Sequence, residues 1–367
     1  MRIVYVLTSL GMGGAERQVV ALAERMAMRG HAVALMVLRP RVAEQWPASV
    51  SVVHLGMRKT LWSALTSMTR GFRFLREFQP DLAHSHSFHA NLATRLLKLC
   101  IPSLRVLSSV HNVYEGGWLR MLAYRLTDFL SCRTTAVSNA VADGFVAAKA
   151  IPMQKCIVIL NGIELAEFSP SALRRAGMRT AMGVRQEFIW LTAGRMAPAK
   201  DYPNLLKAFR RVLQARPDAR LWIAGEGGGR EAAAIQILAA ESGLGEAVRW
   251  LGLRRDINTL LDAADGFVLA SAWEGMPLAV GEAMAMEKPV VATDVGGVRE
   301  LTGSLGTIAV PRNSGALAQA MLETMERTEE DRRAVGRAAR KRIACDFSMD
   351  ARADDWETLY RKLTARH

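Results

Sequence analysis

FIWLTAGRMAPAKDYPNLLKAFRRVLQARPDARLWIA, residues 188–224, begins and ends with a short apolar run. Between Tyr202 and Ala215 the apolar residues recur every three or four positions, which is typical of an amphipathic helix. The stretch therefore predicts strand, loop, helix and strand in that order. This order is typical of a parallel sheet covered by helices.

The same alternation continues in both directions along the chain. Towards the C-terminus we expect helices over 229–241 and 257–264 and strands over 248–251 and 266–270. Before residue 170 we expect helices over 15–29 and 61–78, and strands over 3–7, 32–38, 50–54, 81–85, 105–109, 134–137 and 156–160. Phe168-Ser169-Pro170 interrupts the pattern. The chain is therefore predicted to be α/β, with two Rossmann-like halves that join near residue 170.

Composition is that of a globular protein. The 367 residues are 50% hydrophobic and 23% charged, enough to bury the cores of two domains. The longest apolar runs are far shorter than the roughly 20 residues that span a bilayer. The first residues lack a convincing signal-peptide cleavage site, so we expect a cytoplasmic protein. Four widely spaced cysteines indicate reduced core residues rather than a disulfide framework or a zinc site.

Positive charge is concentrated in the first half of the chain. The net charge is +13, of which residues 1–170 contribute 19 Lys and Arg against 10 Asp and Glu, a balance of +9. Such an excess suits an anionic partner. No basic run with interleaved aromatic residues and no zinc-finger spacing is present, so nucleic acid is the least favoured partner.

The first strand is followed by a glycine-rich loop, Gly11-Met12-Gly13-Gly14-Ala15-Glu16. Glycines let the backbone approach a phosphate, and the start of the next helix offers free N–H groups. Glu16 stands where a dinucleotide fingerprint needs its third glycine. By itself, the loop is as consistent with a tight helix–strand turn as with a phosphate site.

Two cations follow the strand over 188–193. Gly194-Arg195-Met196-Ala197-Pro198-Ala199-Lys200 lies between a strand and a helix, at the edge of the sheet where ligands bind. Arg195 can fork onto phosphate oxygens and Lys200 can supply a point charge. This position favours a diphosphate site over two ordinary surface cations.

A pair of carboxylates follows in SAWEGMPLAVGEAMAMEKPVVATDVGGVREL, residues 271–301. Pro277 suits the first turn of a helix that runs to about Met286, and the helix N-terminus can face an anion. Glu274 precedes this helix and Glu282 lies inside it. Because a carboxylate beside a diphosphate is repelled, we expect both to accept hydrogen bonds from hydroxyl groups of a ribose and a sugar.

At these positions the chain resembles the retaining glycosyltransferases of family 4, which have the GT-B architecture, two Rossmann-like domains facing across a cleft. The resemblance runs from Met1 to about Tyr360. Its most specific element is the E-x7-E motif, Glu274 to Glu282. It implies an acceptor-binding domain over 1–170, a nucleotide-sugar-binding domain over 171–345 and a C-terminal helix over 346–367 that returns to the first domain.

The family pattern implies a role for each matching residue. Arg195 and Lys200 hold the diphosphate, Glu282 the ribose hydroxyls and Glu274 the transferred sugar. His111 lies against the donor sugar, although from the residues alone it could equally be a core histidine. The other residues that the resemblance places at the donor are Gly13, Gly14, Gly194, Glu226, Gly275, Met276 and Pro277.

These roles imply transfer of a sugar from a UDP- or GDP-linked donor to an acceptor hydroxyl, with retention at the anomeric carbon. Charge builds up on the departing diphosphate, where Arg195, Lys200 and the helix that begins near Pro277 stabilise it. The chain contains no Asp-x-Asp sequence. We therefore expect neither a metal requirement nor a further cofactor, because the two cations can do the work of a metal.

Two stretches of the first half bear on the acceptor. Leu61, Leu65, Met68, Phe72, Leu75 and Phe78 follow helical spacing, which favours a core-facing stripe. The stretch over 118–126 is apolar nearly all round, and Trp118 and Leu122 could anchor the basic half to an anionic membrane. We expect peripheral association with the inner face of the membrane and a lipid-linked acceptor, such as a glycan of the cell envelope; a soluble saccharide or phosphorylated acceptor is the alternative.

Two other functions fit part of the pattern. A nucleotide-sugar epimerase can share the fold, but the carboxylate pair together with Arg195 and Lys200 favours transfer. A non-catalytic nucleotide-sugar-binding subunit is less favoured because every motif residue, including His111, is present.

Overall fold

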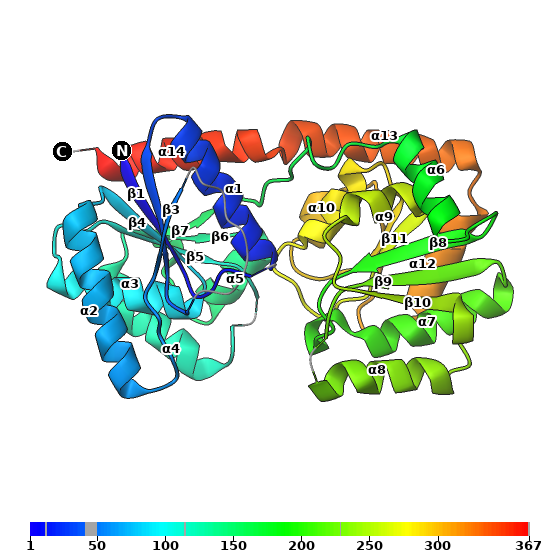
Figure 1. Cartoon of the computed structure of the whole chain (residues 1–367), viewed down its shortest axis with the longest axis horizontal. Coiled ribbons are helices and arrows are strands. Elements are labelled where there is room, and N and C mark those ends of the chain that lie inside the picture. The colour runs from blue at the N-terminus through cyan, green and yellow to red at the C-terminus, as the bar shows by residue number, and fades with distance from the viewer. Residues whose placement is uncertain (12, 41–49, 114, 228, 366–367) are drawn as a thin grey trace. The chain divides into compact units, whose positions relative to one another are not determined.

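The computed structural model describes residues 1–11, 13–40, 50–113, 115–227 and 229–365. The chain divides into two compact units (Figure 1). Unit 1 comprises Met1–Gly162 and Met349–His367, and unit 2 comprises Ile163–Ser348. Each unit is built on one parallel sheet, which confirms the predicted α/β class with two Rossmann-like halves.

The sheet of unit 1 has the strand order β3-β2-β1-β4-β5-β6-β7, and every pairing is parallel. Its strands are short and mostly buried, as continuous apolar runs such as Ile3–Leu7 require of a sheet covered on both faces. They are β1 (Arg2–Leu7), β2 (Ala32–Val37), β3 (Ser51–His54), β4 (Leu82–His86), β5 (Val106–Val110), β6 (Arg133–Ala136) and β7 (Cys156–Val158).

Helices cover both faces of this sheet. On one face, α1 and α14 pack together over a core that includes Tyr5, Leu107 and Tyr360. A second core forms with α2 and α3 around Val4, Met36 and other residues of the same strands that point the opposite way. The helical segments are α1 (Gly14–Met28), α2 (Leu61–Phe78), α3 (Phe88–Cys100), α4 (Trp118–Thr127), η1 (Asp128–Leu130), α5 (Asn139–Ala147), η2 (Met153–Lys155) and α14 (Met349–Thr364).

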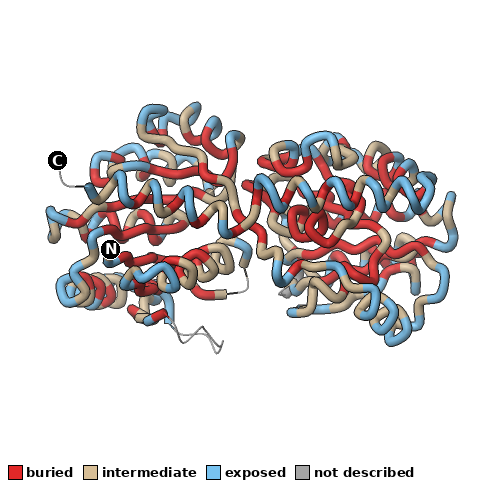
Figure 2. The backbone as a smooth tube through the Cα atoms, turned by 90° about the horizontal axis from the view of Figure 1, so that it is seen from above, coloured by how far each residue is buried: buried red, intermediate tan, exposed pale blue. Residues whose placement is uncertain are grey.

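Unit 2 repeats the plan with the strand order β10-β9-β8-β11-β12-β13. Its strands are β8 (Phe188–Ala193), β9 (Ala219–Ala224), β10 (Val248–Gly252), β11 (Gly266–Leu269), β12 (Val290–Thr293) and β13 (Thr307–Ala309). Its helical segments are α6 (Ala172–Ala181), η3 (Pro198–Lys200), α7 (Tyr202–Ala215), α8 (Gly229–Glu241), η4 (Gly245–Ala247), α9 (Ile257–Ala263), α10 (Leu278–Ala285), α11 (Val298–Thr302), α12 (Ser314–Glu326) and α13 (Glu329–Asp346). Figure 2 shows the strands buried inside and the outer faces of the helices exposed.

The chain crosses between the units twice, after Gly162 and after Ser348. The residues of unit 2 at these two crossings lie side by side. Ile163 pairs with Ser348 in a parallel bridge, and the Ile163 N–H donates to the carbonyl of Phe347 at 2.8 Å. The first boundary therefore lies between Gly162 and Ile163 rather than near residue 170. Phe168, beside the expected join, is fully packed in unit 2 with 1% of its surface exposed.

One predicted core stripe is only partly buried. Leu75 is buried, but Leu61 and Leu65 at the start of α2 are 87% and 62% exposed, so the prediction was wrong for these two residues. The 18 residues of α2 extend about 27 Å. The edge strand β3 has four residues and extends about 13 Å. The helix is therefore about twice as long as β3, the strand that precedes it in the chain.

The cysteines also differ in part from the prediction. All four cysteines are free, but Cys100 and Cys345 are exposed rather than in the core. No helix within the described parts of the chain is long and apolar enough to cross a membrane.

Candidate active site

In unit 2, the loops after β8 and β9 meet where the parallel strands end. Gly194 and Gly225 follow these strands with φ of 158° and 151°. A Cβ atom on Gly225 would lie 1.9 Å from the carbonyl oxygen of Gly194, so no other residue fits there. This close approach brings together the loops that carry Arg195 and Glu226, whose carbonyl accepts from the N–H of Met196 at 3.1 Å.

Lys200 and Glu274 form an ion pair in this region, although 74 residues separate them in the sequence. Nζ of Lys200 donates to Oε1 of Glu274 at 2.6 Å, and Oγ of Ser271 donates to the same oxygen at 2.7 Å. The N–H of Ala272 donates to the carbonyl of Ala199 at 2.8 Å, which fixes the two loops side by side. Among the described residues, Oε2 of Glu274 has no hydrogen-bond partner, so one carboxylate oxygen is available to a ligand.

The turn Gly275-Met276-Pro277 is buried and leads into α10. Pro277, predicted to lie in the first turn of the helix, is the residue directly before it, with an extended ψ of 106°. Among the described residues, no side chain forms a capping hydrogen bond at the start of α10, so its N-terminal backbone can favour an anion. The turn is held by the N–H of Gly297, which donates to the carbonyl of Gly275 at 2.7 Å.

The other predicted donor residues of unit 2 differ in exposure. Arg195 is exposed, and its guanidinium has no hydrogen-bond or ion-pair partner within the described part of the chain. Glu226 is also exposed, whereas Glu282, in the second turn of α10, is 5% exposed. Within its described residues, unit 2 thus combines an unpaired guanidinium, a paired ammonium and three carboxylates, of which Glu226 is exposed, Glu274 half-buried and Glu282 buried.

In unit 1, Gly13 and Gly14 stand at the start of α1. Gly13 is the residue before the helix and Gly14 its first residue, and no side chain within the described ranges caps this end. Met12 lies outside the described residues. The placement keeps the backbone N–H groups of a helix start beside the end of β1, as the loop pattern predicted.

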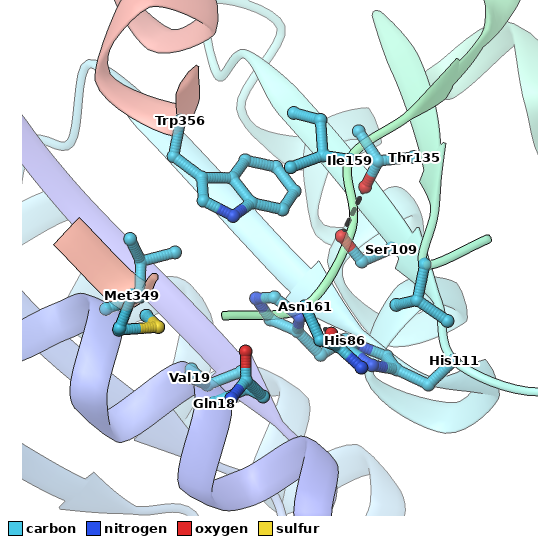
Figure 3. Close-up of a pocket in the computed structure, with 12 residues that line it drawn as sticks. Gln18, Val19, His86, Ser109, His111, Thr135, Ile159, Asn161, Met349 and Trp356 are labelled. Carbon is cyan, nitrogen blue, oxygen red and sulfur yellow. Dashed lines mark hydrogen bonds between the residues drawn. The ribbon is translucent and has the colours of Figure 1, made fainter. Parts of the chain in front are cut away.

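His111 lies just beyond β5, at the same edge of the unit 1 sheet. Its Nε2 lies 3.0 Å from Nδ1 of His86, the last residue of β4 (Figure 3). His84, two residues earlier in β4, contacts His86 with ring centroids 4.0 Å apart and the ring planes tilted by 43°. His84 is held by Tyr360 of α14 and by Ser109, each at 2.7 Å. His111 is therefore not an isolated core histidine but the outermost member of a cluster of three.

This cluster is neutral at physiological pH. Desolvation by burial lowers the pKa of His111 to about 4. Burial, and then the proximity of the other rings, lowers the pKa of His86 and of His84 well below the usual value of histidine. Whichever tautomer His86 adopts, its Nε2 is buried without a hydrogen-bond partner among the described residues.

A small pocket opens beside His86 and His111 within unit 1, lined also by Gln18, Asn161 and Trp356 (Figure 3). The side chain of Gln18 forms two hydrogen bonds with the backbone of Gly162, the last residue of the first segment of unit 1. Its Nε2 donates to the carbonyl of Gly162 at 2.5 Å, and its Oε1 accepts from the N–H of Gly162 at 2.8 Å. The pocket is thus lined by His86 and His111 together with Gln18, whose side chain is fixed by the backbone of Gly162.

Hydrogen bonds and close backbone approaches bring together Gly194, Lys200, Glu274 and the Gly275–Pro277 turn. Arg195, Glu226 and Glu282 lie on adjoining elements. Sequence reasoning missed Ser271, Gln18 and His86. Only His86 gave a signal, the alternating His84-Ser85-His86 at the end of a strand. Over the described residues, no group of three or more His, Cys, Asp or Glu side chains is placed to hold a metal ion.

Comparison with protein families matches both units. The family described as Glycosyl transferases group 1 matches residues 187–327, and Glycosyltransferase Family 4 matches residues 12–167, so together they cover most of the chain. Among individual relatives, a UDP-Gal:alpha-D-GlcNAc-diphosphoundecaprenol alpha-1,3-galactosyltransferase of Escherichia coli is 26% identical over 249 residues. A glycogen synthase of Mycobacterium tuberculosis is 27% identical over 301 residues.

These alignments cover 64% and 77% of this chain, and 62% and 67% of the respective relatives. The chain thus spans about three fifths of the length of the galactosyltransferase. Among solved structures, a glycosyltransferase of Rickettsia africae has a TM-score of 0.87 at 21% identity, covering 100% of this chain and 99% of that one. Anabaena HepE in complex with UDP and glucose has a TM-score of 0.86 at 21% identity, covering 97% and 98%. These likenesses confirm the predicted GT-B fold.

Proposed function

The chain belongs to the group 1 glycosyltransferases of family 4, and we propose that it transfers a sugar, with retention, from a UDP-linked donor to an acceptor hydroxyl. UDP is favoured over GDP because the E. coli relative is named for UDP-Gal and HepE was solved with UDP. The observation that carries the proposal is the group formed by Arg195, Lys200 and Glu274 at the carboxyl edge of unit 2.

The donor diphosphate binds the two cations of this group. The free guanidinium of Arg195 suits a forked contact with phosphate oxygens. Lys200 can share its three donors between Glu274 and a phosphate, since its ammonium carries three N–H groups. The uncapped start of α10 adds a favourable dipole. Three sources of positive potential thus serve one anion.

The two carboxylates bind hydroxyl groups. Glu274 offers its open Oε2 to the transferred sugar while Oε1 remains bonded to Lys200 and Ser271. Glu282 accepts from the ribose hydroxyls. Because Lys200 neutralises Glu274, the carboxylate can lie near the diphosphate without the repulsion that an unpaired charge would cause.

In the reaction, the bond between the anomeric carbon and the diphosphate oxygen breaks, and a bond to the acceptor oxygen forms on the same face of the sugar. Negative charge grows on the departing diphosphate, where Arg195 and Lys200 stabilise it most. A departing phosphate oxygen takes the acceptor proton, so no separate base is required. His111, neutral because its pKa is about 4, serves as a hydrogen-bonding partner of the donor sugar rather than as an acid.

We propose that no metal takes part, because the cations and the helix start supply the positive charge. Activity should therefore be the same with and without a chelator. A loss of at least tenfold in the presence of EDTA, restored by Mg²⁺ or Mn²⁺, would contradict this part of the proposal.

The acceptor is proposed to be a lipid-linked glycan of cell-envelope synthesis, met at the cytoplasmic face of the membrane. The name of the E. coli relative states that it acts on a sugar attached to diphosphoundecaprenol. The basic first half of this chain suits such an anionic acceptor.

Thermal shift with UDP, GDP and ADP tests the donor assignment, since a ligand that binds only the folded protein raises its melting temperature. UDP should give the largest rise in the native protein and little rise in Arg195→Ala. Equal shifts with all three would sink the assignment. Incubation with UDP-sugar alone separates the rival functions: an isomerised sugar indicates an epimerase, and bound donor that never reacts with any acceptor indicates a binding subunit.

A further inference from the structure

The outer face of the helical layer formed by α2, α3 and α4 is apolar. α3 packs against both α2 and α4, so the three helices cover the same side of the unit 1 sheet (Figure 1). Ten of the sixteen large hydrophobic side chains found exposed in the described residues belong to this layer and the η1 turn that follows it. This α2–α4 face comprises Leu61, Trp62, Leu65, Leu96, Leu99, Trp118, Leu119, Leu122, Leu126 and Phe129.

The clearest part of the face is α4 with η1. Trp118, Leu122, Leu126 and Phe129 follow one another at intervals of four, four and three residues, which places them in one stripe. Trp118 and Phe129 are 72% and 71% exposed, whereas Tyr124 is buried on the opposite side. A helix that served only its own fold would turn its apolar stripe inward. This stripe points outward and indicates an apolar partner.

Cations without partners surround the face. Arg58 and Lys59 lie just before Thr60, the residue that caps α2, and Arg125 lies on α4 beside the stripe. All three cations are exposed, and none has an ion-pair or hydrogen-bond partner for its side chain among the described residues. Residues 58–133 contain 11 Lys and Arg against 4 Asp and Glu, a balance of +7 out of the +13 of the whole chain.

The acidic residues of this segment do little to offset the cations. Glu115 accepts from the hydroxyl of Tyr124 at 2.7 Å, and burial raises the pKa of this carboxyl group. Asp128 is buried and pairs with Lys155 at 3.0 Å. Only Glu77 and Asp81, at the far end of α2, are exposed. The surface near the apolar stripe is therefore cationic.

We infer that the α2–α4 face docks on an anionic lipid bilayer, with Trp118, Leu122, Leu126 and Phe129 in the interfacial region and Arg58, Lys59 and Arg125 among the headgroups. Tryptophan and leucine on an exposed face next to Lys and Arg are typical of segments that lie in the plane of a membrane interface. A second copy of the chain fits less well. An isologous dimer through this face would bring the same unpaired cations of two copies together.

This inference deepens the proposed function. It rests on the proposed function only for the reason why the face would bind a membrane, which is that a lipid-linked acceptor is found there. The docking itself follows from the exposed residues of unit 1. The donor group lies in unit 2 and shares no residue with the face. Membrane binding and donor chemistry can therefore be measured separately.

Co-sedimentation of the full chain with vesicles tests the inference. The vesicles contain either phosphatidylcholine alone or equal parts of phosphatidylcholine and phosphatidylglycerol. The test variant is Leu122→Glu with Leu126→Glu. The matched control is Leu173→Glu with Leu253→Glu, which changes two exposed leucines of unit 2. A third variant, with Arg58, Lys59 and Arg125 changed to Gln, tests the charge.

The native protein and the control should bind the anionic vesicles, and the leucine variant should bind at least tenfold more weakly. The charge variant should bind more weakly and lose most of the dependence on NaCl between about 0.05 M and about 0.5 M. No binding of the native protein at low salt, or equal losses in variant and control, would overturn the inference. So would a dimer in sedimentation equilibrium that the leucine variant abolishes.

Two further measurements distinguish a misfolded variant, a failure of membrane docking and a failure of the proposed function. Far-ultraviolet circular dichroism and thermal melting show whether each variant is folded. UDP release from UDP-sugar without vesicles should be equal in the native protein and the leucine variant. Vesicle binding without any affinity for UDP would sink the proposed function and leave the docking face standing, whereas UDP release without vesicle binding would do the reverse.

Discussion

The two units place different chemistry at the same position of the same fold. In unit 2, the carboxyl edge of the sheet carries the cationic side chains of Arg195 and Lys200 and the acidic side chain of Glu274. In unit 1, the corresponding edge carries His86 and His111, whose pKa values are lowered by burial so that both rings are neutral. The strand–loop–helix geometry is common to both edges, and the side chains decide what each edge can bind.

The difference teaches what each edge is suited for. Fixed charges stabilise a diphosphate best when its own charge grows, as it does when the sugar departs. A neutral imidazole can hydrogen-bond a sugar without attracting the diphosphate away from the cations. We therefore expect that charge matters most in unit 2, whereas hydrogen-bonding capacity and burial matter most in unit 1.

The largest effect should come from removing the charges of unit 2. We expect Arg195→Ala and Lys200→Ala each to lower kcat by about 100- to 1000-fold, because each removes stabilisation of the charge that develops in the transition state. Initial rates of UDP release measure this. Equal turnover in both variants and the native protein would remove these residues from the phosphate site.

Stability distinguishes the two variants. Arg195 has no partner within the described residues, so Arg195→Ala should leave the free energy of unfolding nearly unchanged. Lys200→Ala leaves Glu274 without its ion-pair partner, at a side-chain exposure of 13%, and should cost about 1 kcal/mol. The double change Lys200→Met with Glu274→Gln serves as the control that leaves no unpaired charge.

Acid should destabilise unit 1 through its histidines. His111 titrates near pH 4 when folded but near 6.5 when unfolded, so the unfolded chain binds more protons between these values. Its contribution to stability is present above pH 6.5 and is lost as the pH falls towards 4. The loss at pH 5 is about 2 kcal/mol for His111 alone.

Urea unfolding at pH 7.5 and pH 5 measures this loss. His86 and His84 act in the same direction because their pKa values are also lowered. In His111→Asn, the difference in the free energy of unfolding between the two pH values should shrink by about 2 kcal/mol. An unchanged difference would show that the ring of His111 is not desolvated in solution.

A smaller effect is expected at the ribose carboxylate. Glu282→Ala should raise KM for the donor by about tenfold with little change in kcat, because ribose hydrogen bonds are present in both the ground state and the transition state. Donor titrations at saturating acceptor measure it. A defect that appears only when the acceptor is varied would contradict the assignment.

The smallest effect should be that of a neutral replacement in unit 1. Because His111 is uncharged, the amide of His111→Gln can keep part of its hydrogen bonding, and kcat should fall only about fivefold. The matched change in unit 2, Lys200→Gln, should fall at least tenfold further. Similar losses in the two variants would abolish the contrast between the edges.

Helices and strands could be predicted where the hydrophobic pattern agrees with the residues that begin and end such elements. The predicted strands over 188–193 and 219–224 and the helix over 202–215 were confirmed. Glycine, proline and Asp201 mark the ends of these elements, and the two apolar strands are buried. The exposed start of α2 could not be predicted, since Leu61 and Leu65 obey helical spacing whether they face a strand or solvent. Periodicity tells which side chains share a face and not what covers that face.

Contacts within the site were less accessible to sequence reasoning. Lys200 and Glu274 were both predicted to serve the donor, but their direct ion pair depends on how two loops 74 residues apart are held. His86 lies 25 residues before His111, and the bond of Gln18 to Gly162 spans 144 residues. Such contacts arise only from the order of strands in the sheet, which alternation alone does not specify.

The double passage between the units has a consequence for the order of folding during synthesis. α14 belongs to unit 1, but the ribosome makes it only after all of unit 2. Until then the core around Tyr5 lacks Ala353, Trp356 and Tyr360, and His84 lacks the hydroxyl that bonds it. During synthesis, the first unit therefore exposes part of its hydrophobic core until α14 has been made. The second unit is continuous in the chain and can complete its own core first.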